Sequence, residues 1–427
     1  MKALYWRFYF VICLLFCPIP LLIKLLLGWL APYFLYCPFM KKTLFFDATS
    51  CHWTGASVYL LAYIKLSASL AKFNSSIDKI DNIFFLVLLE QVQLLKSIGL
   101  SPNQMIILDS GAYPAWLPSL IVKSIGLKQI LQRVPPSSLF LINSQFIFLG
   151  KHSKIFKVWH ASLHLCPKIF IKYLFFKPLR FCRLLVELFL DCVNSKFFVG
   201  YIYPSAWCRN LVTNRIPLAK NLKSAVIQHD LQYLHAYQDS IHYFDPSLPR
   251  LADPELALRL IYVASLDIYK NHDLLLSWLD KCTAIPFELV LVGPLVVSSV
   301  LDNIKSSRSW QTGRVSYLGR LSSEEALSLY KSSHVALAFS SAETFGYPVA
   351  EAMYFRVPLV YYDNNCNSEL GSFLGHPVSS ASQFQDLIRK IYSNYSFYLK
   401  SSNVETPFSD FVASDQLSKT INFISSH

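Results

Sequence analysis

Residues 338–360 read A-F-S-S-A-E-T-F-G-Y-P-V-A-E-A-M-Y-F-R-V-P-L-V, and the rest of the chain can be placed around them. The apolar run from Val335 to Phe339 ends in two serines, which is typical of a buried strand leaving a parallel sheet. Gly346 and Pro348 predict a tight turn into a helix, because proline is tolerated in a first helical turn. Val357-Pro358 then opens another strand. The stretch therefore predicts strand, turn, helix and strand of an α/β fold.

Two glutamates, Glu343 and Glu351, are separated by seven residues across this turn. Glu343 lies on the loop and Glu351 about one turn inside the helix, so both can face a ligand at the helix N-terminus. That helix end favours an anion, because it presents free N–H groups and a partial positive charge. Two carboxylates beside an anion site fit a nucleotide-diphosphate sugar, which has hydroxyls at both ends and phosphates between them. The alternative is a polar loop followed by a carboxylate that only stabilises the helix dipole.

The segment E-T-F-G-Y-P-V-A-E-A-M resembles the E-x7-E signature of glycosyltransferase family 4, whose members have the GT-B fold. The resemblance implies that Glu343 contacts the donor sugar and that Glu351 holds the ribose. The backbone that would bind the diphosphate belongs to Phe345, Gly346 and Tyr347. The resemblance extends over residues 257–370.

Other donor-binding residues follow from the same resemblance. Lys270 matches a lysine that binds the diphosphate in the family. Arg320 and Leu321 follow a turn at Gly319 that contacts the base in the family, so both are candidates for base recognition.

Two residues depart from the family pattern. Arg356 stands where glycine is usual, and a left-handed residue after a helix prefers glycine. Ser265 stands where an arginine is expected, five residues before Lys270. A fixed cation stabilises a leaving diphosphate as negative charge develops. With Ser265, the site relies on Lys270, on the helix dipole or on a basic group from elsewhere.

The first half of the chain resembles the family more weakly, in the same order, over residues 43–240. Gly55 resembles a glycine-rich turn where the backbone approaches the donor phosphates, although Thr54 replaces a second glycine. His160 follows a short strand, and related members have a histidine near the donor sugar at this place. A structural histidine on a loop is the alternative. Glu343 and His160 are the candidate catalytic residues.

Charge is distributed unevenly along the chain. Residues 1–240 carry 25 Lys and Arg against 9 Asp and Glu, whereas residues 241–427 carry 14 against 18. A basic half indicates an anionic partner, either a membrane or a nucleic acid. No nucleic-acid-binding motif accompanies the charge, so we expect a membrane surface and no nucleic acid. A solvated basic face is the alternative.

Two segments are candidates for membrane contact. Residues 8–37 are apolar over more than the about 20 residues that a spanning helix needs, but Pro18, Pro20 and Lys24 interrupt them. A spanning helix, an in-plane anchor and a cleaved signal peptide all stay open, and Met40 could be the true start. Residues 168–199 mix basic and aromatic side chains, which is typical of an in-plane helix at an anionic bilayer. A core helix with snorkelling basic residues is the alternative.

Metal and disulfide signals are weak. The ten cysteines are scattered without a C-x-x-C pair, which fits a reducing compartment. His160, His164 and Cys166 have a spacing that could bind zinc, but no second ligand pair stands nearby. The sequence contains no D-x-D pair, so we expect no metal and no cofactor, with the nucleotide sugar acting as a substrate.

The resemblance implies two Rossmann-like domains facing across a cleft, and the apolar start of the chain predicts a hydrophobic membrane segment before them. The expected parts are a membrane anchor, an acceptor domain, a nucleotide-sugar domain and a helix crossing back to the acceptor domain, at residues 1–39, 40–247, 248–400 and 401–427. We place the boundary between the two domains in the proline-rich segment around residues 245–255.

The resemblance implies a retaining glycosyltransferase, and we expect it to be metal-independent and to act in polysaccharide biosynthesis. It would move a sugar from a nucleotide-diphosphate sugar to a lipid-linked or surface-glycan acceptor. We expect it to be membrane-associated, with its catalytic domains in the cytoplasm. The alternative is a catalytically silent nucleotide-sugar-binding scaffold of a membrane glycan-assembly complex.

Overall fold

The structure, a computed structural model, describes most of the chain within one compact unit, Lys41–His427. The described residues are 43–48, 82–88, 91–97, 100–109, 116–135, 137–147, 154–159, 165–229, 234, 257–373, 375–402 and 416–426. The candidates Gly55 and His160, His164 of the weak zinc pattern and the predicted anchor 1–39 lie outside them. None of the described helices has the length and apolar character needed to cross a bilayer.

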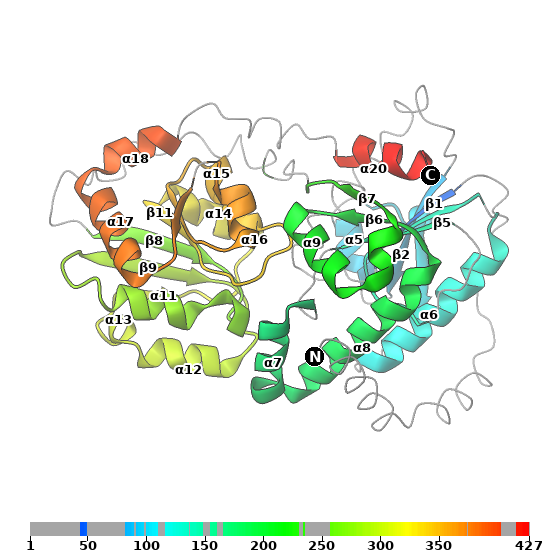
Figure 1. Ribbon diagram of the computed structural model, residues 1–427, viewed down its shortest axis with the longest axis horizontal. Coiled ribbons are helices and arrows are strands. Elements are labelled where there is room, and N and C mark those ends of the chain that lie inside the picture. The colour runs from blue at the N-terminus through cyan, green and yellow to red at the C-terminus, as the bar shows by residue number, and fades with distance from the viewer. Residues whose placement is uncertain are drawn as a thin grey trace. The chain divides into compact units, whose positions relative to one another are not determined.

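The first sheet has seven described strands, all parallel, in the order β3-β2-β1-β4-β5-β6-β7 (Figure 1). Their bounds are Thr43–Asp47, Asn82–Leu88, Met105–Asp109, Leu139–Ile142, Lys154–Val158, Phe198–Tyr203 and Lys223–Val226 for β1 to β7. Strands covered on both faces have continuous apolar runs, such as Leu44-Phe45-Phe46 in the middle of β1, and every residue of β1 is buried.

Helices accompany the first sheet between and after its strands. They are α5 Val92–Ser97, α6 Trp116–Arg133, α7 Pro167–Phe176, α8 Pro178–Asn194, α9 Ala206–Arg215 and the last helix α20 Gln416–Ser425, with short 3-10 turns at Pro102–Gln104, Ser195–Phe197 and Pro217–Asn221. The last helix returns to this sheet from the far end of the chain: Ile424 is buried in its core, and the Phe423 ring lies 5.8 Å from the Phe156 ring.

The second sheet has six described parallel strands in the order β10-β9-β8-β11-β12-β13. The strands are β8 Leu258–Val263, β9 Phe287–Val292, β10 Val315–Tyr317, β11 Val335–Ala338, β12 Leu359–Tyr362 and β13 His376–Val378. The helices are α11 His272–Leu279, α12 Ser298–Ser306, α13 Arg308–Gln311, α14 Ser323–Lys331, α15 Tyr347–Tyr354, α16 Asn365–Gly371, α17 Ala381–Ser393 and α18 Tyr395–Ser402, with a 3-10 turn at Ile268–Lys270.

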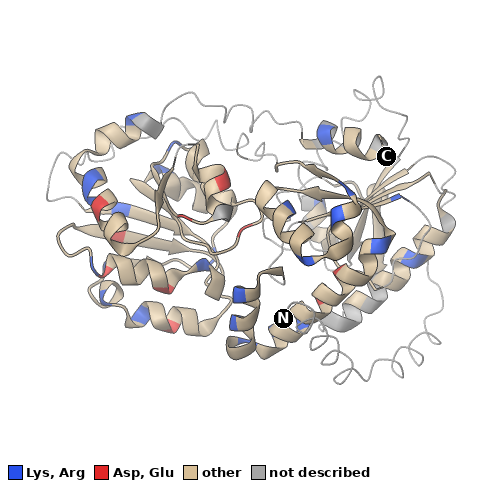
Figure 2. Ribbon diagram, viewed as in Figure 1, with Lys and Arg blue, Asp and Glu red and all other residues tan. Residues whose placement is uncertain are grey.

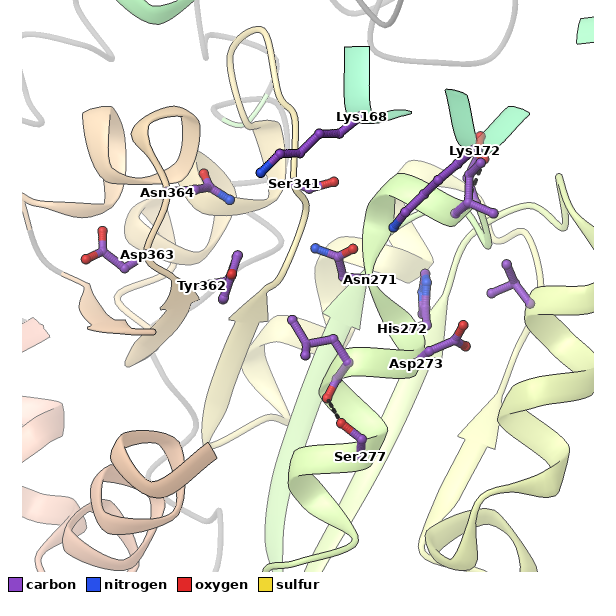
Figure 3. A pocket seen from close by; sticks show the side chains of 14 residues that line it. Lys168, Lys172, Asn271, His272, Asp273, Ser277, Ser341, Tyr362, Asp363 and Asn364 are labelled. Carbon is purple, nitrogen blue, oxygen red and sulfur yellow. Dashed lines mark hydrogen bonds between the residues drawn. The ribbon is translucent and has the colours of Figure 1, made fainter. Parts of the chain in front are cut away.

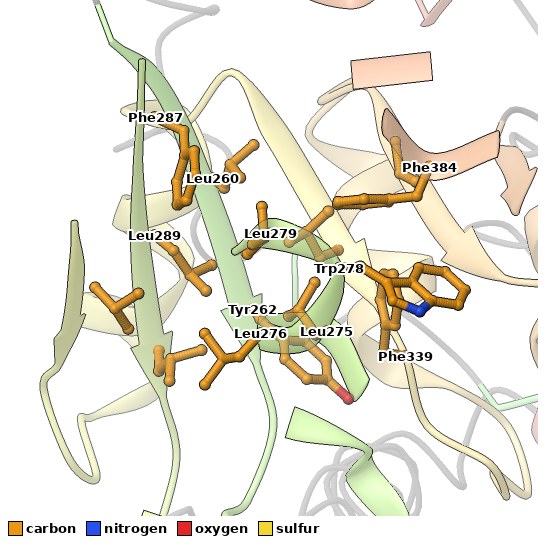
Figure 4. Packing of buried hydrophobic residues seen from close by; sticks show 14 of the residues in the cluster. Leu260, Tyr262, Leu275, Leu276, Trp278, Leu279, Phe287, Leu289, Phe339 and Phe384 are labelled. Carbon is orange, nitrogen blue, oxygen red and sulfur yellow. The ribbon is translucent and has the colours of Figure 1, made fainter. Parts of the chain in front are cut away.

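Apolar side chains of β8 point alternately to the two faces of this sheet, and helices cover both faces. Leu260 and Tyr262 point into a core that α11, α12 and α17 cover, where Trp278 packs between Phe339 and Phe384 (Figure 4). Ile261 points to the opposite face, into the core under α14 and α15. Successive side chains of a strand face opposite ways, so a continuous apolar run is needed when both faces are buried.

The strand order reverses once in each described sheet, between β1 and β4 and between β8 and β11. In open α/β sheets, ligands bind outside the carboxyl ends of the strands at such a switch point. The residues that follow β8 and β11 are therefore the first place to look for a site. The domain limits predicted from the sequence stay predictions, because residues 235–256 lie outside the described part.

The end of α15 shows what Arg356 does in place of glycine. The N–H of Arg356 donates to the Met353 carbonyl at 3.1 Å, and the N–H of Val357 donates to the Ala352 carbonyl at 3.0 Å. These two bonds form a Schellman motif, which needs a left-handed residue. Arg356 adopts that conformation, with φ 55°. The turn is therefore the one that glycine would make, and arginine makes it under strain.

Arg356→Gly is expected to stabilise the protein. A non-glycine residue in the left-handed region costs roughly 1–2 kcal/mol, and the extra freedom of glycine in the unfolded chain offsets part of the gain. We expect a net gain of about 0.5–1 kcal/mol, measured as a thermal midpoint higher by about 2 °C. Arg356→Ala is the control, because it removes the same side chain and keeps the strain. Equal midpoints for the glycine and alanine variants would contradict this interpretation.

Candidate functional site

The residues after β8 and β11 bring an ion pair to the switch point of the second sheet. Lys270 follows β8 and Glu343 follows β11, and the Lys270 ammonium donates to a carboxylate oxygen of Glu343. The side chains are 9% and 17% exposed. Sequence reasoning selected both residues separately, one for the diphosphate and one for the sugar. The structure places them in contact with each other.

The charge of Lys270 is maintained despite burial. Burial is the largest single influence on the pKa of Lys270 and acts to lower it, but the Glu343 charge, Tyr269, Tyr262 and the hydrogen bond to Glu343 together raise this pKa above the ordinary value for lysine. The ammonium also lies 4.8 Å from the centre of the Tyr269 ring, a favourable cation–π distance. Lys270 is therefore a cation that is held in place in a mostly buried site.

Hydrogen bonds between the two loops fix this pair. The Ser341 N–H and hydroxyl donate to the Tyr269 carbonyl at 2.8 and 2.9 Å. The Asn271 side chain donates to the Phe339 carbonyl at 2.9 Å, and Asn271 itself adopts a left-handed φ of 53°. The Tyr262 hydroxyl donates to the Lys270 carbonyl at 2.6 Å. The ion pair thus sits on a loop frame that is hydrogen-bonded across the switch point.

The N-terminus of α15 begins where the sequence predicted it. Gly346 precedes the helix with φ 91°, and Pro348 lies in its first turn. Phe345 is buried in the core beneath α15. The His229 ring, which follows β7 of the first sheet, stacks on Tyr347 at 5.5 Å and meets Phe345 edge-on at 5.0 Å. Sequence reasoning missed His229, since nothing near it in the chain marks this contact.

Glu351 has a partner that limits its freedom. The Tyr330 hydroxyl, on α14, donates to a Glu351 carboxylate oxygen at 3.2 Å. Tyr330 is buried, and burial together with the Glu351 charge raises the pKa of its hydroxyl well above the usual value. The phenol therefore stays protonated and donates to one carboxylate oxygen of Glu351.

The base-recognition candidates lie beyond β10. Gly319 has φ 72°, and its carbonyl accepts from the Gly293 N–H at 2.8 Å. Arg320 follows and is exposed, and Leu321 is half-buried. The structure places both residues on the loop between β10 and α14, and their role stays a prediction.

The loop that lacks the expected arginine contains a buried carboxylate with a cation from another part of the chain. Asp267, two residues after Ser265, is 1% exposed. It accepts from the Tyr173 hydroxyl of α7 at 2.7 Å and from the Arg180 guanidinium of α8 at 2.9 Å. Arg180 also lies over the Tyr173 ring. A basic side chain from elsewhere therefore does reach this loop, and Asp267 balances its charge.

A second set of contacts joins the Glu343 loop to α9. The Ser205 hydroxyl donates to the Thr344 carbonyl at 2.5 Å. The Glu369 carboxylate accepts from the Ala206 and Trp207 N–H groups at 2.7 and 2.8 Å, at the N-terminus of α9. A carboxylate is stabilised there by free N–H groups and the helix dipole. No local sequence pattern marks either contact, since the partners lie more than 100 residues apart.

A pocket of about 670 Å³ lies beside the ion pair, between α7 and the carboxyl edge of the second sheet. Figure 3 shows Lys168 and Lys172 reaching from α7 toward Ser341 and Asn271. No group of three or more potential metal-binding side chains occurs among the described residues.

The sequence of the second sheet matches a known family. Residues 249–402 match the model for glycosyl transferases group 1. The match includes every strand of the second sheet and the loops that carry Lys270, Glu343 and Glu351. The chain therefore contains a glycosyltransferase group 1 domain. No curated protein matches the sequence.

Solved structures share the whole architecture. Anabaena Alr3699/HepE in complex with UDP and glucose aligns with a TM-score of 0.62 and 16% identity over 90% of this chain and 99% of that one. A glycosyltransferase from Rickettsia africae ESF-5 gives 0.61 and 12%, over 91% and 98%. The apo lipopolysaccharide outer core galactosyltransferase WaaB gives 0.55 and 14%, over 90% and 99%. At these identities the likeness establishes the fold, which is α/β and GT-B-like with two parallel sheets.

Proposed function

We propose that this protein is a retaining glycosyltransferase of family 4 that transfers a sugar from a nucleotide-diphosphate sugar. One observation carries the proposal: Lys270 and Glu343 meet at the switch point of a glycosyltransferase group 1 domain. An ion pair of this kind can separate when a donor arrives. Lys270 then faces the diphosphate and Glu343 accepts from a sugar hydroxyl.

The N-terminus of α15 completes the donor site. The turn at Gly346 leads into a helix whose first N–H groups and dipole favour phosphate. Glu351, one turn inside α15, accepts a hydrogen bond from Tyr330 and is the carboxylate that we propose for the ribose. Negative charge that develops on the leaving diphosphate is stabilised by Lys270 and by the helix dipole. This chemistry uses positioned charges and hydrogen-bond donors, so we expect turnover without a metal ion.

The acceptor is proposed from the charge of the first half of the chain. Its excess of basic residues fits an anionic, membrane-bound acceptor, either a lipid-linked sugar or a growing surface glycan. WaaB, which has the same fold, is named as a lipopolysaccharide outer core galactosyltransferase. We propose a membrane-associated enzyme with its catalytic domains in the cytoplasm, acting in polysaccharide biosynthesis.

A silent scaffold is the second candidate, and Ser265 favours it. A transferase that loses one of two cations beside the diphosphate stabilises the leaving group less. A protein that only binds a nucleotide sugar would tolerate this loss. The intact pair of Lys270 and Glu343 favours the enzyme.

Nucleotide release tests the proposal and names the donor. Full-length protein is incubated with UDP-, GDP-, ADP- and dTDP-sugars, with membrane extract as the acceptor source. We expect release of one nucleotide that depends on the extract and falls about a hundredfold in Glu343→Gln, because the amide removes the charge that faces the sugar and Lys270.

Two controls sharpen the result. Glu288→Gln neutralises an exposed glutamate on β9 and is expected to leave release unchanged. EDTA is expected to leave turnover intact, and its loss would contradict metal-independent chemistry. Binding of one donor without release in any sample would favour the scaffold.

A further inference from the structure

The corner between α7 and α8 exposes a group of large apolar side chains. Phe175 is 77% exposed, Phe176 54% and Leu179 87%, and Ile171 and Leu174 are exposed beside them. The opposite face of α7 is buried through Ile169, Phe170 and Tyr173. We call the exposed set, Ile171, Leu174, Phe175, Phe176 and Leu179, the apolar corner. Such a contiguous patch is unusual on a surface that faces only water and indicates a partner.

The charges around the apolar corner indicate what kind of partner fits it. Residues 167–186 contain five lysines and arginines and no aspartate or glutamate. Figure 2 shows α7 with basic residues and without acidic ones. A helix with an apolar face and flanking lysines is typical of contact with an anionic bilayer, where each basic side chain adds attraction to the lipid headgroups. A protein partner would need matching acidic groups, whereas an anionic lipid supplies both the charge and the apolar phase.

The pocket beside α7 places its lysines next to a buried polar group without a partner. Lys168 and Lys172 of α7 line the pocket (Figure 3). Across from them lies His272, which is 1% exposed. Within the described part of the chain, neither of its ring nitrogens has a hydrogen-bond partner.

The state of His272 and its neighbours suggests what the pocket takes. Burial and the nearby Lys270 charge lower the pKa of His272 to about 3, so the ring is neutral and can donate to an oxygen. Asn271, Ser341 and Asn364 add hydrogen-bonding groups, and Asp273 and Asp363 add acceptors suited to hydroxyls. Two lysines, a neutral imidazole and hydroxyl acceptors fit a phosphate that carries a polyol or a sugar.

We propose that the apolar corner docks on an anionic lipid bilayer and that the pocket beside it receives the phosphate headgroup of a lipid. The helix α7 supplies both halves of this contact, with its apolar side chains toward the acyl region and its two lysines toward the headgroup. The pocket adjoins the Lys270–Glu343 pair through Asn271 and Ser341, so a bound lipid lies beside the candidate donor site. That the lipid is the sugar acceptor rests on the proposed function; the docking does not.

Local hydrogen exchange on the full-length protein tests the docking without interference from residues 1–42. Exchange over residues 167–181 is measured with vesicles of phosphatidylcholine and with vesicles of equal parts phosphatidylcholine and phosphatidylglycerol. With the anionic vesicles we expect about tenfold slower exchange at this segment, which corresponds to about 1.4 kcal/mol. We expect no slowing with phosphatidylcholine alone, and none at α18 with either.

Substitutions assign the slowing to the named side chains. The triple change Phe175→Ser, Phe176→Ser and Leu179→Ser is expected to abolish it, and so is Lys168→Ala with Lys172→Ala. The matched controls are Phe397→Ser, which removes an aromatic ring 60% exposed on α18, and Lys305→Ala with Lys390→Ala, which removes two exposed lysines. The control variants are expected to keep the slowing.

Each outcome decides the proposal. Unchanged exchange over 167–181 in protein that sediments with anionic vesicles would overturn it. So would slowing at the start of α11 by soluble glycerol phosphate without any effect of vesicles on α7, since the pocket would then bind a soluble phosphate. Nucleotide release on the same samples separates this proposal from the proposed function: docking without release contradicts only the transferase, and release without docking contradicts only the docking surface.

Discussion

Lys270→Met is expected to lower nucleotide release about a thousandfold, because it removes a positioned cation from a site that has serine where a second one is expected. Methionine keeps most of the side-chain length without the charge. Lys270 is buried, and its ammonium contacts Glu343. Initial rates with the donor found in the nucleotide panel measure the loss. Lys270→Arg should retain more activity than methionine, since the charge is kept, but less than wild type, since a planar guanidinium does not fit a site built around an ammonium.

The same substitution should also destabilise the fold, and a double variant separates the two effects. Removing one partner of a buried ion pair leaves the other charge unpaired, at a cost of about 3–5 kcal/mol. Lys270→Met with Glu343→Gln removes both charges, so we expect most of the stability to return while activity stays lost. Recovery of activity together with stability would mean that the pair is structural and that the donor binds elsewhere.

Sequence reasoning located the Glu343–Glu351 side of the site because its residues lie close together in the chain. The turn at Gly346, the helix α15 and the glutamate at each end of the E-x7-E segment lie within a few residues of one another, so spacing alone predicts their placement. The matching lysine is distant in sequence, but β8 and β11 are neighbours in a parallel sheet. Parallel strands deliver the residues at their carboxyl ends to one edge, which is why Lys270 and Glu343 meet.

The contacts that sequence reasoning missed come from elements with no local pattern. Asp267 is paired with Arg180, 87 residues earlier in the chain, and Glu369 binds the N-terminus of α9, 163 residues earlier. The basic and aromatic segment 168–199 was predicted as one in-plane or core helix. It forms α7 and α8, because Pro178 begins a new helix. One face of α7 is buried and the apolar corner is exposed, and contact with a membrane stays a proposal.

Gly293→Ala is expected to destabilise the protein strongly. Gly293 follows β9 with φ 148°, a conformation that side chains rarely adopt. A Cβ atom there would lie 2.2 Å from the Ala264 carbonyl oxygen and 2.9 Å from the Ser265 nitrogen. Both atoms are backbone at the end of β8, so no side chain can rotate away. Backbone strain and overpacking together are expected to cost about 4 kcal/mol, measured as a thermal midpoint lower by about 10 °C.

Gly313→Ala is the matched control, because it adds a Cβ atom at a positive φ without bringing that atom against the backbone. Gly313 has φ 73°, and an added Cβ would meet nothing within 4 Å. It should cost only the left-handed strain, about 1–2 kcal/mol. The difference between the thermal midpoints of Gly293→Ala and Gly313→Ala then reports how closely the end of β9 approaches the Ala264–Ser265 backbone.

If Gly293→Ala relieves the collision by moving that backbone, Lys270 moves with it, so nucleotide release should fall even at temperatures where the variant stays folded. Equal midpoints for the two variants would contradict the close approach, and intact release in a folded Gly293→Ala protein would show that the Lys270 loop does not depend on it.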